Sequence, residues 1–148
     1  MLIQTLKKIF RRDLELLRSE IEQYKTESQI WVVDKQIANT AGNLCLHLVG
    51  NLNTYIGDEF GKTGYIRNRE LEFSLKDVPR EELIQKVNDT IQVIDHALDQ
   101  VTEKQLSEEY PKLVLKERTT TEYFLIHLAT HLTYHLGQIN YHRRLLDI

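Results

Sequence analysis

Residues 124–138 decide the fold that this sequence predicts: Phe124-Leu-Ile-His127-Leu-Ala-Thr-His131-Leu-Thr-Tyr-His135-Leu-Gly-Gln138. The stretch has no proline and its apolar residues recur at helical spacing, so it predicts an α-helix. Each residue of an α-helix advances by about 100°, which places five side chains within an arc of about 80°: His127, His131, His135, Gln138 and His142. Imidazoles four residues apart are neighbours on one helix face and can offer two nitrogens to one metal ion.

Only one pair of histidines on this helix can share a single ion. His127 and His135 lie about 12 Å apart along the axis, whereas metal–nitrogen bonds measure about 2.0–2.1 Å. The pair is therefore His127 with His131 or His131 with His135, and the spacing leaves both open. The competing interpretation is that these histidines only form hydrogen bonds between helices. Three histidines in register favour a metal, and the third ligand must come from elsewhere in the chain.

Length and composition indicate an ordinary globular chain. The 148 residues, 41% hydrophobic and 28% charged, predict one domain over residues 1–148 with its own core. Two prolines and six glycines interrupt the chain rarely, which favours an all-α fold. The net charge of −3 argues against nucleic acid as a partner. The single cysteine, Cys45, fits a reducing compartment, and no run approaches about 18 apolar residues, so we expect a cytoplasmic protein without a membrane partner.

Hydrophobic periodicity predicts two helices in the first half of the chain. The first spans about residues 2–24. The second begins near Ile30 or Val33 and runs to Ile56, with Gly57 at its C-terminus, where glycine is favoured.

Two further helices follow in the second half. The motif Asp77-Val-Pro79 marks a helix start, with a capping acid and a proline in the first turn, and His96 falls on the exposed face of that helix. The hydroxyl caps of Thr119-Thr-Thr121 begin the histidine helix, which ends near Leu146. Four amphipathic helices predict a four-helix bundle, in which sites are built from side chains on facing helices.

The second helix carries a polar stripe of small and amide residues beside its apolar one: Thr40, Asn43, His47, Gly50, Asn51 and Thr54. Small side chains around one histidine predict a groove, because bulky residues would close it. We therefore predict that His47 is the third ligand.

The residue types exclude several familiar sites. Di-iron bundles need glutamates and Glu-x-x-His pairs, whereas the acids here are expected on solvent faces, away from the histidines. Helix metalloproteases need His-Glu-x-x-His, but Leu132, Thr133 and Tyr134 separate His131 from His135. A mononuclear site with three neutral imidazoles and an open position remains, and zinc is the expected metal, with nickel or iron as alternatives.

The stretch from residue 57 to residue 78 is predicted as a long irregular connection that contains Arg67 and Arg69. The favoured interpretation is a solvated loop held by weak ion pairs. The alternative is that the two arginines hold an anionic substrate.

The histidine helix resembles the last helix of the DinB-like, or YfiT-like, bundle proteins. Their signature His-x-x-x-His-x-Gly-Gln matches His131, His135, Gly137 and Gln138, and the segment Asn43-Leu-Cys-Leu-His47-Leu is similar to their second-helix histidine. The loop from Thr63 to Phe73 resembles that of an uncharacterised branch. This resemblance implies an up-down-down-up bundle with one divalent metal on His47, His131 and His135, and it leaves His127 as a pocket or packing residue.

The resemblance also implies an activity. Characterised relatives transfer or isomerise adducts of low-molecular-weight thiols, so we expect a small-molecule substrate and a metal-dependent thiol S-transferase or hydrolase. The alternative is a non-catalytic, metal-stabilised binding or stress-associated module. A homodimer is expected as well, because the last helix carries more aromatic and apolar surface than one seam requires: Tyr123, Phe124, Tyr134, Tyr141 and Leu145.

Overall fold

The computed structural model describes residues 1–148 and is built from helices, with no β-strand and one isolated bridge between Glu109 and Thr120. The α-helices are α1 (Leu2–Gln23), α2 (Ala41–Leu52), α3 (Glu59–Gly61), α4 (Arg69–Ser74), α5 (Arg80–Asp99), α6 (Glu103–Ser107) and α7 (Thr121–Leu146). A 3-10 turn covers Glu27–Trp31, and a π-helical segment, Asn53–Asp58, joins α2 to α3. The predicted all-α fold is confirmed.

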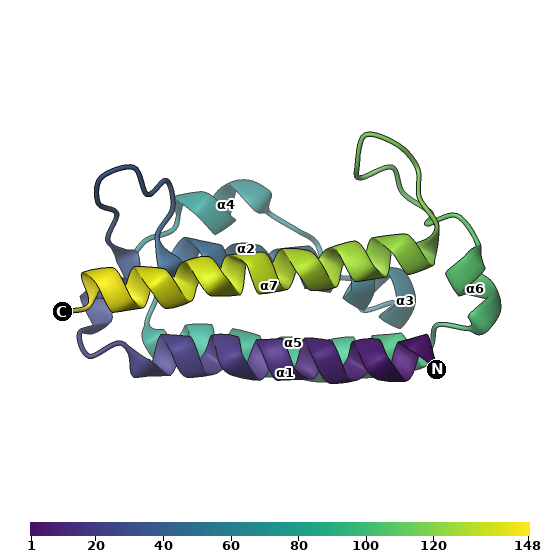
Figure 1. Cartoon of the computed structure of the whole chain (residues 1–148), viewed down its shortest axis with the longest axis horizontal. Coiled ribbons are helices and arrows are strands. Elements are labelled where there is room, and N and C mark those ends of the chain that lie inside the picture. The colour runs from purple at the N-terminus through teal and green to yellow at the C-terminus, as the bar shows by residue number, and fades with distance from the viewer.

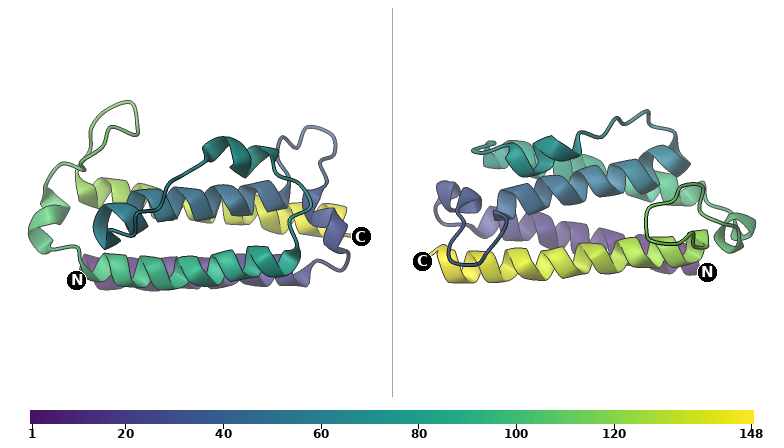
Figure 2. Two further views of the ribbon diagram at one scale, coloured as in Figure 1. Left: turned by 180° about the vertical axis from the view of Figure 1, so that it is seen from behind. Right: turned by 90° about the horizontal axis from the view of Figure 1, so that it is seen from above.

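The long helices α1, α5 and α7 lie alongside α2 and its π-helical extension (Figures 1 and 2). Helix α1 packs against α5 and α7, and α2 packs against α5 and α7 from the other side. The short helix α4 lies over the outer face of α2, as both views of Figure 2 show. None of the helices combines the length and the apolar character that a membrane span requires. The contact between α2 and α7 is the one that positions the predicted ligands.

The predicted apolar stripes face a single connected core. In α1 the buried stripe is Leu6, Phe10, Leu14, Leu17 and Ile21, and in α5 it is Leu83, Val87, Ile91, Ile94 and Leu98. The predicted extents of the first and last helices are confirmed by α1 and α7. Helix α7 begins at a hydroxyl cap, since Thr120 Oγ1 accepts a hydrogen bond from the Tyr123 amide.

The predicted second helix was wrong at both ends. It begins at Ala41 rather than near Ile30, because Thr40 caps it while the preceding connection runs irregularly through Lys35 at φ 54°. The apolar residues Ile30 and Trp31 suggested an earlier helix start. Both belong to the 3-10 turn, and their side chains are buried in the core. Gly57 does not end the helix, which continues to Gly61. A side chain at Gly57 would meet Cγ1 of Val93, so this glycine permits close packing on α5.

The predicted irregular connection and the predicted cap before α5 also need correction. Residues 57–78 include the end of the second helical segment and α4, which Asn68 caps by accepting a hydrogen bond from the Leu71 amide. Asp77 makes no capping bond: its φ is 57°, and Pro79 is the residue directly before α5. A short helix capped by an amide, and not a solvated loop, therefore covers α2.

Candidate metal centre

Three histidines from two helices converge between α2 and α7. Nε2 of His131 lies 3.3 Å from Nε2 of His47 and 3.2 Å from Nε2 of His135. One ligand atom from each of the three lies within 4.8 Å of the others, so the group could hold a metal ion. The structure brings together the three residues predicted as ligands, with His131 and His135 as the pair from α7.

The two spacings from His131 Nε2 suit a tetrahedral ion, and the third pair of ligand atoms lies within 4.8 Å. Two nitrogens bonded to one ion at about 2.0–2.1 Å in tetrahedral geometry lie about 3.3–3.4 Å apart. Hydrogen bonding alone satisfies the cluster poorly, because one proton on His131 Nε2 can serve only one of its two neighbours. His131 Nδ1 is also buried without any hydrogen-bond partner. The residues present therefore fit a metal better than a hydrogen-bonded seam.

The other ring nitrogens fix the tautomers of His47 and His135. His47 Nδ1 lies 3.0 Å from Oε1 of Glu72, and His135 Nδ1 lies 2.7 Å from Oε1 of Gln138. Arg67 Nη2, a donor, also lies 3.3 Å from His47 Nδ1, and both nitrogens face the same Glu72 oxygen. With Glu72 and Gln138 Oε1 as acceptors, a proton on each Nδ1 leaves each Nε2 with its lone pair.

Burial and neighbouring groups favour the neutral forms of His131 and His135. Burial, followed by the neighbouring His135 and His47, lowers the pKa of His131 to about 4. Burial also lowers the pKa of His135, although the hydrogen bond with Gln138 opposes the shift. Neutral imidazole is the form that binds metals, so both rings are ready to act as ligands near neutral pH.

Glu72 of α4 supports the cluster from outside. Its side chain is buried, and the Arg67 guanidinium donates two hydrogen bonds to it, from Nε to Oε2 at 2.8 Å and from Nη2 to Oε1 at 3.0 Å. Burial alone raises the pKa of Glu72, but the hydrogen bonds from His47 and Arg67 outweigh burial and lower it. The expectation that no acid joins the histidines was wrong. The favoured interpretation of Arg67 as part of a solvated loop was wrong too, since it forms a bidentate, largely buried pair.

Small and amide residues of α2 allow α4 to dock. A Cβ at Gly50 would collide with the Glu72 carboxylate, so glycine makes room for this acid. Asn43 Nδ2 donates to the backbone oxygens of Glu72 and Leu75 at 2.9 and 2.8 Å. Helix α4 therefore covers the stripe predicted to border an open groove at Asn43 and Gly50, whereas Thr54 stays partly exposed.

A family of proteins of unknown function, described as DUF1572, matches residues 1–147. The chain belongs to the DUF1572 family. A comparison with curated proteins found no match. The description of the DUF1572 family names no activity, so the function has to be argued from the site itself.

The remaining histidines of this DUF1572 protein have other surroundings. His127 lies beside the cluster, stacked between the rings of Phe124 and His131 at centroid distances of 6.0 and 6.3 Å. His142 is buried and binds Tyr24 Oη at 2.6 Å and the Val32 carbonyl at 2.7 Å, so it tethers the connection before α2. His96 is exposed, as predicted.

A cavity of about 290 Å³ adjoins the cluster, and we call it the histidine cavity. His47 and His131 form part of its wall. The other lining residues are Asn51, Tyr55, Arg67, Arg69, Val114, Phe124, His127 and Leu128. The DUF1572 protein thus has space for a small molecule next to two of the three predicted ligands.

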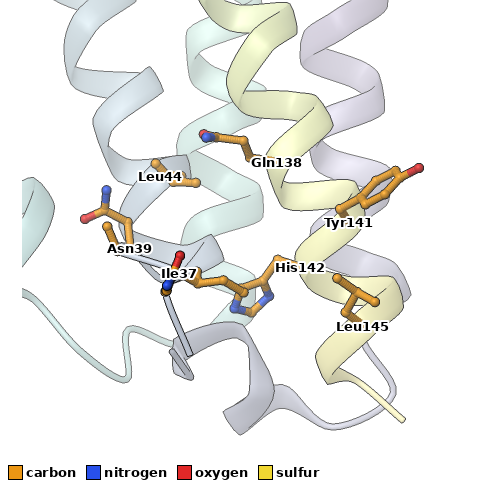
Figure 3. Close-up of a pocket in the computed structure, with 9 residues that line it drawn as sticks. Ile37, Asn39, Leu44, Gln138, Tyr141, His142 and Leu145 are labelled. Atoms are coloured by element: carbon orange, nitrogen blue, oxygen red, sulfur yellow. The ribbon is translucent and has the colours of Figure 1, made fainter. Parts of the chain in front are cut away.

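A second cavity of about 400 Å³ lies nearer the C-terminal end of α7 (Figure 3). Gln138 and His142 point from α7 toward Leu44 of α2, and Tyr141 and Leu145 also line the cavity. Gln138 borders this cavity and also holds His135, so it links the second cavity to the metal centre.

Proposed function

We propose that His47, His131 and His135 hold one divalent metal ion. The observation that carries this proposal is the convergence of three Nε2 atoms, two of which are freed by fixed protons on the opposite ring nitrogens. Zinc is the first candidate because it favours tetrahedral nitrogen sites, and nickel or iron(II) are alternatives that imidazoles also accept.

We further assign the chain to the DinB-like, or YfiT-like, superfamily as an up-down-down-up four-helix bundle in the cytoplasm. The signature residues His131, His135, Gly137 and Gln138 support this assignment, as does the packing of α2 against α7. In the structure, Gln138 of the signature holds His135, which gives the motif a physical role.

The proposed activity is that of a metal-dependent thiol S-transferase or hydrolase acting on a small molecule. A divalent ion on three neutral imidazoles keeps its full charge and acidifies a bound thiol or water. The chain's own residues prepare this chemistry: Glu72 and Gln138 orient two rings, and Arg67 balances the charge of Glu72. The histidine cavity supports the proposal because it gives a substrate room beside His47 and His131.

The second candidate is a non-catalytic, metal-stabilised binding or stress-associated module. It is favoured by the origin of the ligands on two helices, since an ion shared by α2 and α7 would cross-link them. The two candidates differ in thiol chemistry. Metal-loaded enzyme should release a proton on mixing with a low-molecular-weight thiol and should form adducts with electrophiles. Failure on both counts across a panel of thiols would favour the module.

The metal itself is tested by elemental analysis of protein purified without an affinity tag. We expect one equivalent in the wild type and none in His131→Ala or His135→Ala, because two remaining imidazoles hold an ion poorly. His96→Ala is the matched control, since this histidine is exposed and away from the site. One equivalent of metal in His131→Ala would show that the ligands are assigned wrongly.

A further inference from the structure

Two chemically different groups of residues line the histidine cavity beside its histidines. Val114, Phe124 and Leu128 are apolar, whereas Asn51, Arg67 and Arg69 are polar or positively charged. None of the residues that line this cavity is acidic. A molecule in this cavity therefore meets both positive charge and apolar surface.

Arg69 supplies positive charge that nothing in the chain balances. Glu72 neutralises Arg67, but Arg69 forms no ion pair, and its guanidinium lies 5.1 Å from the centroid of the Phe73 ring. A guanidinium with free donors at a cavity wall attracts carboxylates, which it can bind through two hydrogen bonds. Binding a metal would add further positive charge and favour an anion more strongly.

Asn51 provides a second, independent sign of a ligand. Its side chain lines the cavity, only 8% of the residue is exposed, and Oδ1 has no hydrogen-bond partner. Leaving a buried polar group unsatisfied costs free energy, so such groups are usually paired. A ligand with a hydroxyl or amine beside its anionic group can pair with this amide while its anion meets Arg69.

We propose that the histidine cavity binds a small amphipathic carboxylate that carries a hydroxyl or amine group next to the carboxylate. The carboxylate pairs with Arg69, the neighbouring donor binds Asn51, and the apolar body packs against Phe124 and Leu128. The volume of about 290 Å³ suits a ligand of this size, near the lower end of known ligand pockets. This inference rests on the proposed function because it takes the cavity beside His47 and His131 as the substrate side of the metal centre.

Three related probes separate the contacts. Mandelate carries the charge, the hydroxyl and an apolar ring; phenylacetate lacks the hydroxyl, and mandelamide lacks the charge. Calorimetric titration of the metal-loaded full chain should show mandelate binding about tenfold more tightly than mandelamide, and several-fold more tightly than phenylacetate. The titrations are repeated without metal. Affinity that remains then comes from Arg69 and Asn51 and not from coordination of the carboxylate by the metal ion.

Arg69→Gln should weaken mandelate binding about tenfold and leave mandelamide binding unchanged. Arg144→Gln is the matched control, because Arg144 is also exposed, also lies over an aromatic ring, at 5.2 Å from that of Tyr141, and is outside the cavity. Asn51→Ala should abolish the preference for mandelate over phenylacetate, with circular dichroism used to confirm that the variant is folded. Since Arg69 is exposed, its variant tests the inference even if Asn51→Ala fails to fold.

The outcomes distinguish this inference from the proposed function. Mandelate binding that depends on Arg69 in a chain that holds no metal would support the inference and refute the metal centre. Stoichiometric metal together with equal affinity for mandelate and mandelamide would overturn the inference alone. Wild-type affinity for mandelate in Arg69→Gln, or no binding of any probe, would overturn it as well.

Discussion

At the scale of single residues, the candidate site depends on what each histidine's second nitrogen contacts. His47 and His135 have acceptors at Nδ1, so their Nε2 atoms are free to bind an ion. His142 has partners at both ring nitrogens, and nothing is left for a metal. His47 and His142 are both buried, and their hydrogen-bond partners separate the candidate ligand from the structural histidine.

Replacing Glu72 tests the support of His47. Glu72→Gln removes the charge that holds the Nδ1 proton and leaves Arg67 without its partner, so metal affinity should fall by about 10–100-fold while the helical content is kept. Competition with a chromophoric chelator measures the affinity. Glu70→Gln, an exposed acid on the same helix, should behave as the wild type. Equal affinity in both variants would contradict the assigned role.

His142 predicts a pH dependence of stability. Burial lowers its pKa below the ordinary value of 6.5, so the unfolded chain binds a proton more readily than the folded chain. Its contribution to stability is therefore complete above pH 6.5 and is lost as the pH falls through the folded-state pKa. The loss is at most about 1.4 kcal/mol per pH unit.

Urea unfolding of metal-free protein at pH 7.5 and pH 5.5 measures this contribution. The free energy of unfolding should fall more steeply toward acid in the wild type than in His142→Gln, which lacks the titrating ring. Other groups titrate in both proteins, so only the difference between the two slopes is used. Identical slopes would show that His142 is not the responsible group.

At the scale of elements, the decisive contact is the docking of α4 on α2. Asn43 binds the backbone of α4, and Gly50 leaves room for the Glu72 carboxylate. The chain places His47 and Gly50 three residues apart, on the same side of α2. A short helix thus supplies the acid that orients His47, and it can do so only where α2 has no side chain.

Gly50→Ala should separate stability from metal affinity. Alanine favours a helix interior over glycine by about 1 kcal/mol, but its methyl group collides with the Glu72 carboxylate and displaces it from His47. We expect a folded protein whose metal affinity falls in the manner of Glu72→Gln, measured by the same chelator competition.

Gly137→Ala is the matched control, because no atom lies within 4 Å of the added carbon in α7. This variant should keep the wild-type affinity and gain thermal stability. Unchanged metal affinity in Gly50→Ala would mean that the carboxylate accommodates the methyl group without leaving His47.

At the scale of the whole molecule, one face remains without a partner. Tyr123, Tyr134, Tyr141 and Leu145 on α7 are each more than half exposed. Phe124, which was expected among them, is instead buried against Tyr110. A shallow cavity with a volume of about 630 Å³ lies between α1 and α7, and its lining includes Leu2, Ile9, Ile126 and Tyr134. Neither the connection before α5 nor the one before α7 covers these tyrosines.

The homodimer therefore stays a prediction, with this face as its interface. Light scattering should give twice the monomer mass of 17.5 kDa for the wild type. Tyr134→Glu should give the monomer, because it places a charge in the centre of the face. Ile66→Glu, at an exposed site outside the face, should remain dimeric. A wild type that scatters as a monomer at micromolar concentration would exclude the dimer.

Local sequence patterns predict the features that depend on spacing within one helix. The apolar stripes of α1, α5 and α7 follow from a helical period, and that period alone aligns His131 with His135 on one face. His47 was also predictable, since small residues surround it on its own helix. Local patterns suffice in these cases because the interacting positions lie within one or two turns of the same element.

The start of α2, the partner of His47 and the role of His142 depend on contacts between distant segments, and the sequence patterns do not predict them. Glu72 lies 25 residues from His47, and His142 lies 118 residues from Tyr24. Ile30, expected at the start of the second helix, is buried in a 3-10 turn instead. Glu72, expected on a solvent face, is buried because α4 docks on α2. These contacts form when separate elements pack together, and no periodicity within one segment encodes which element will be the neighbour.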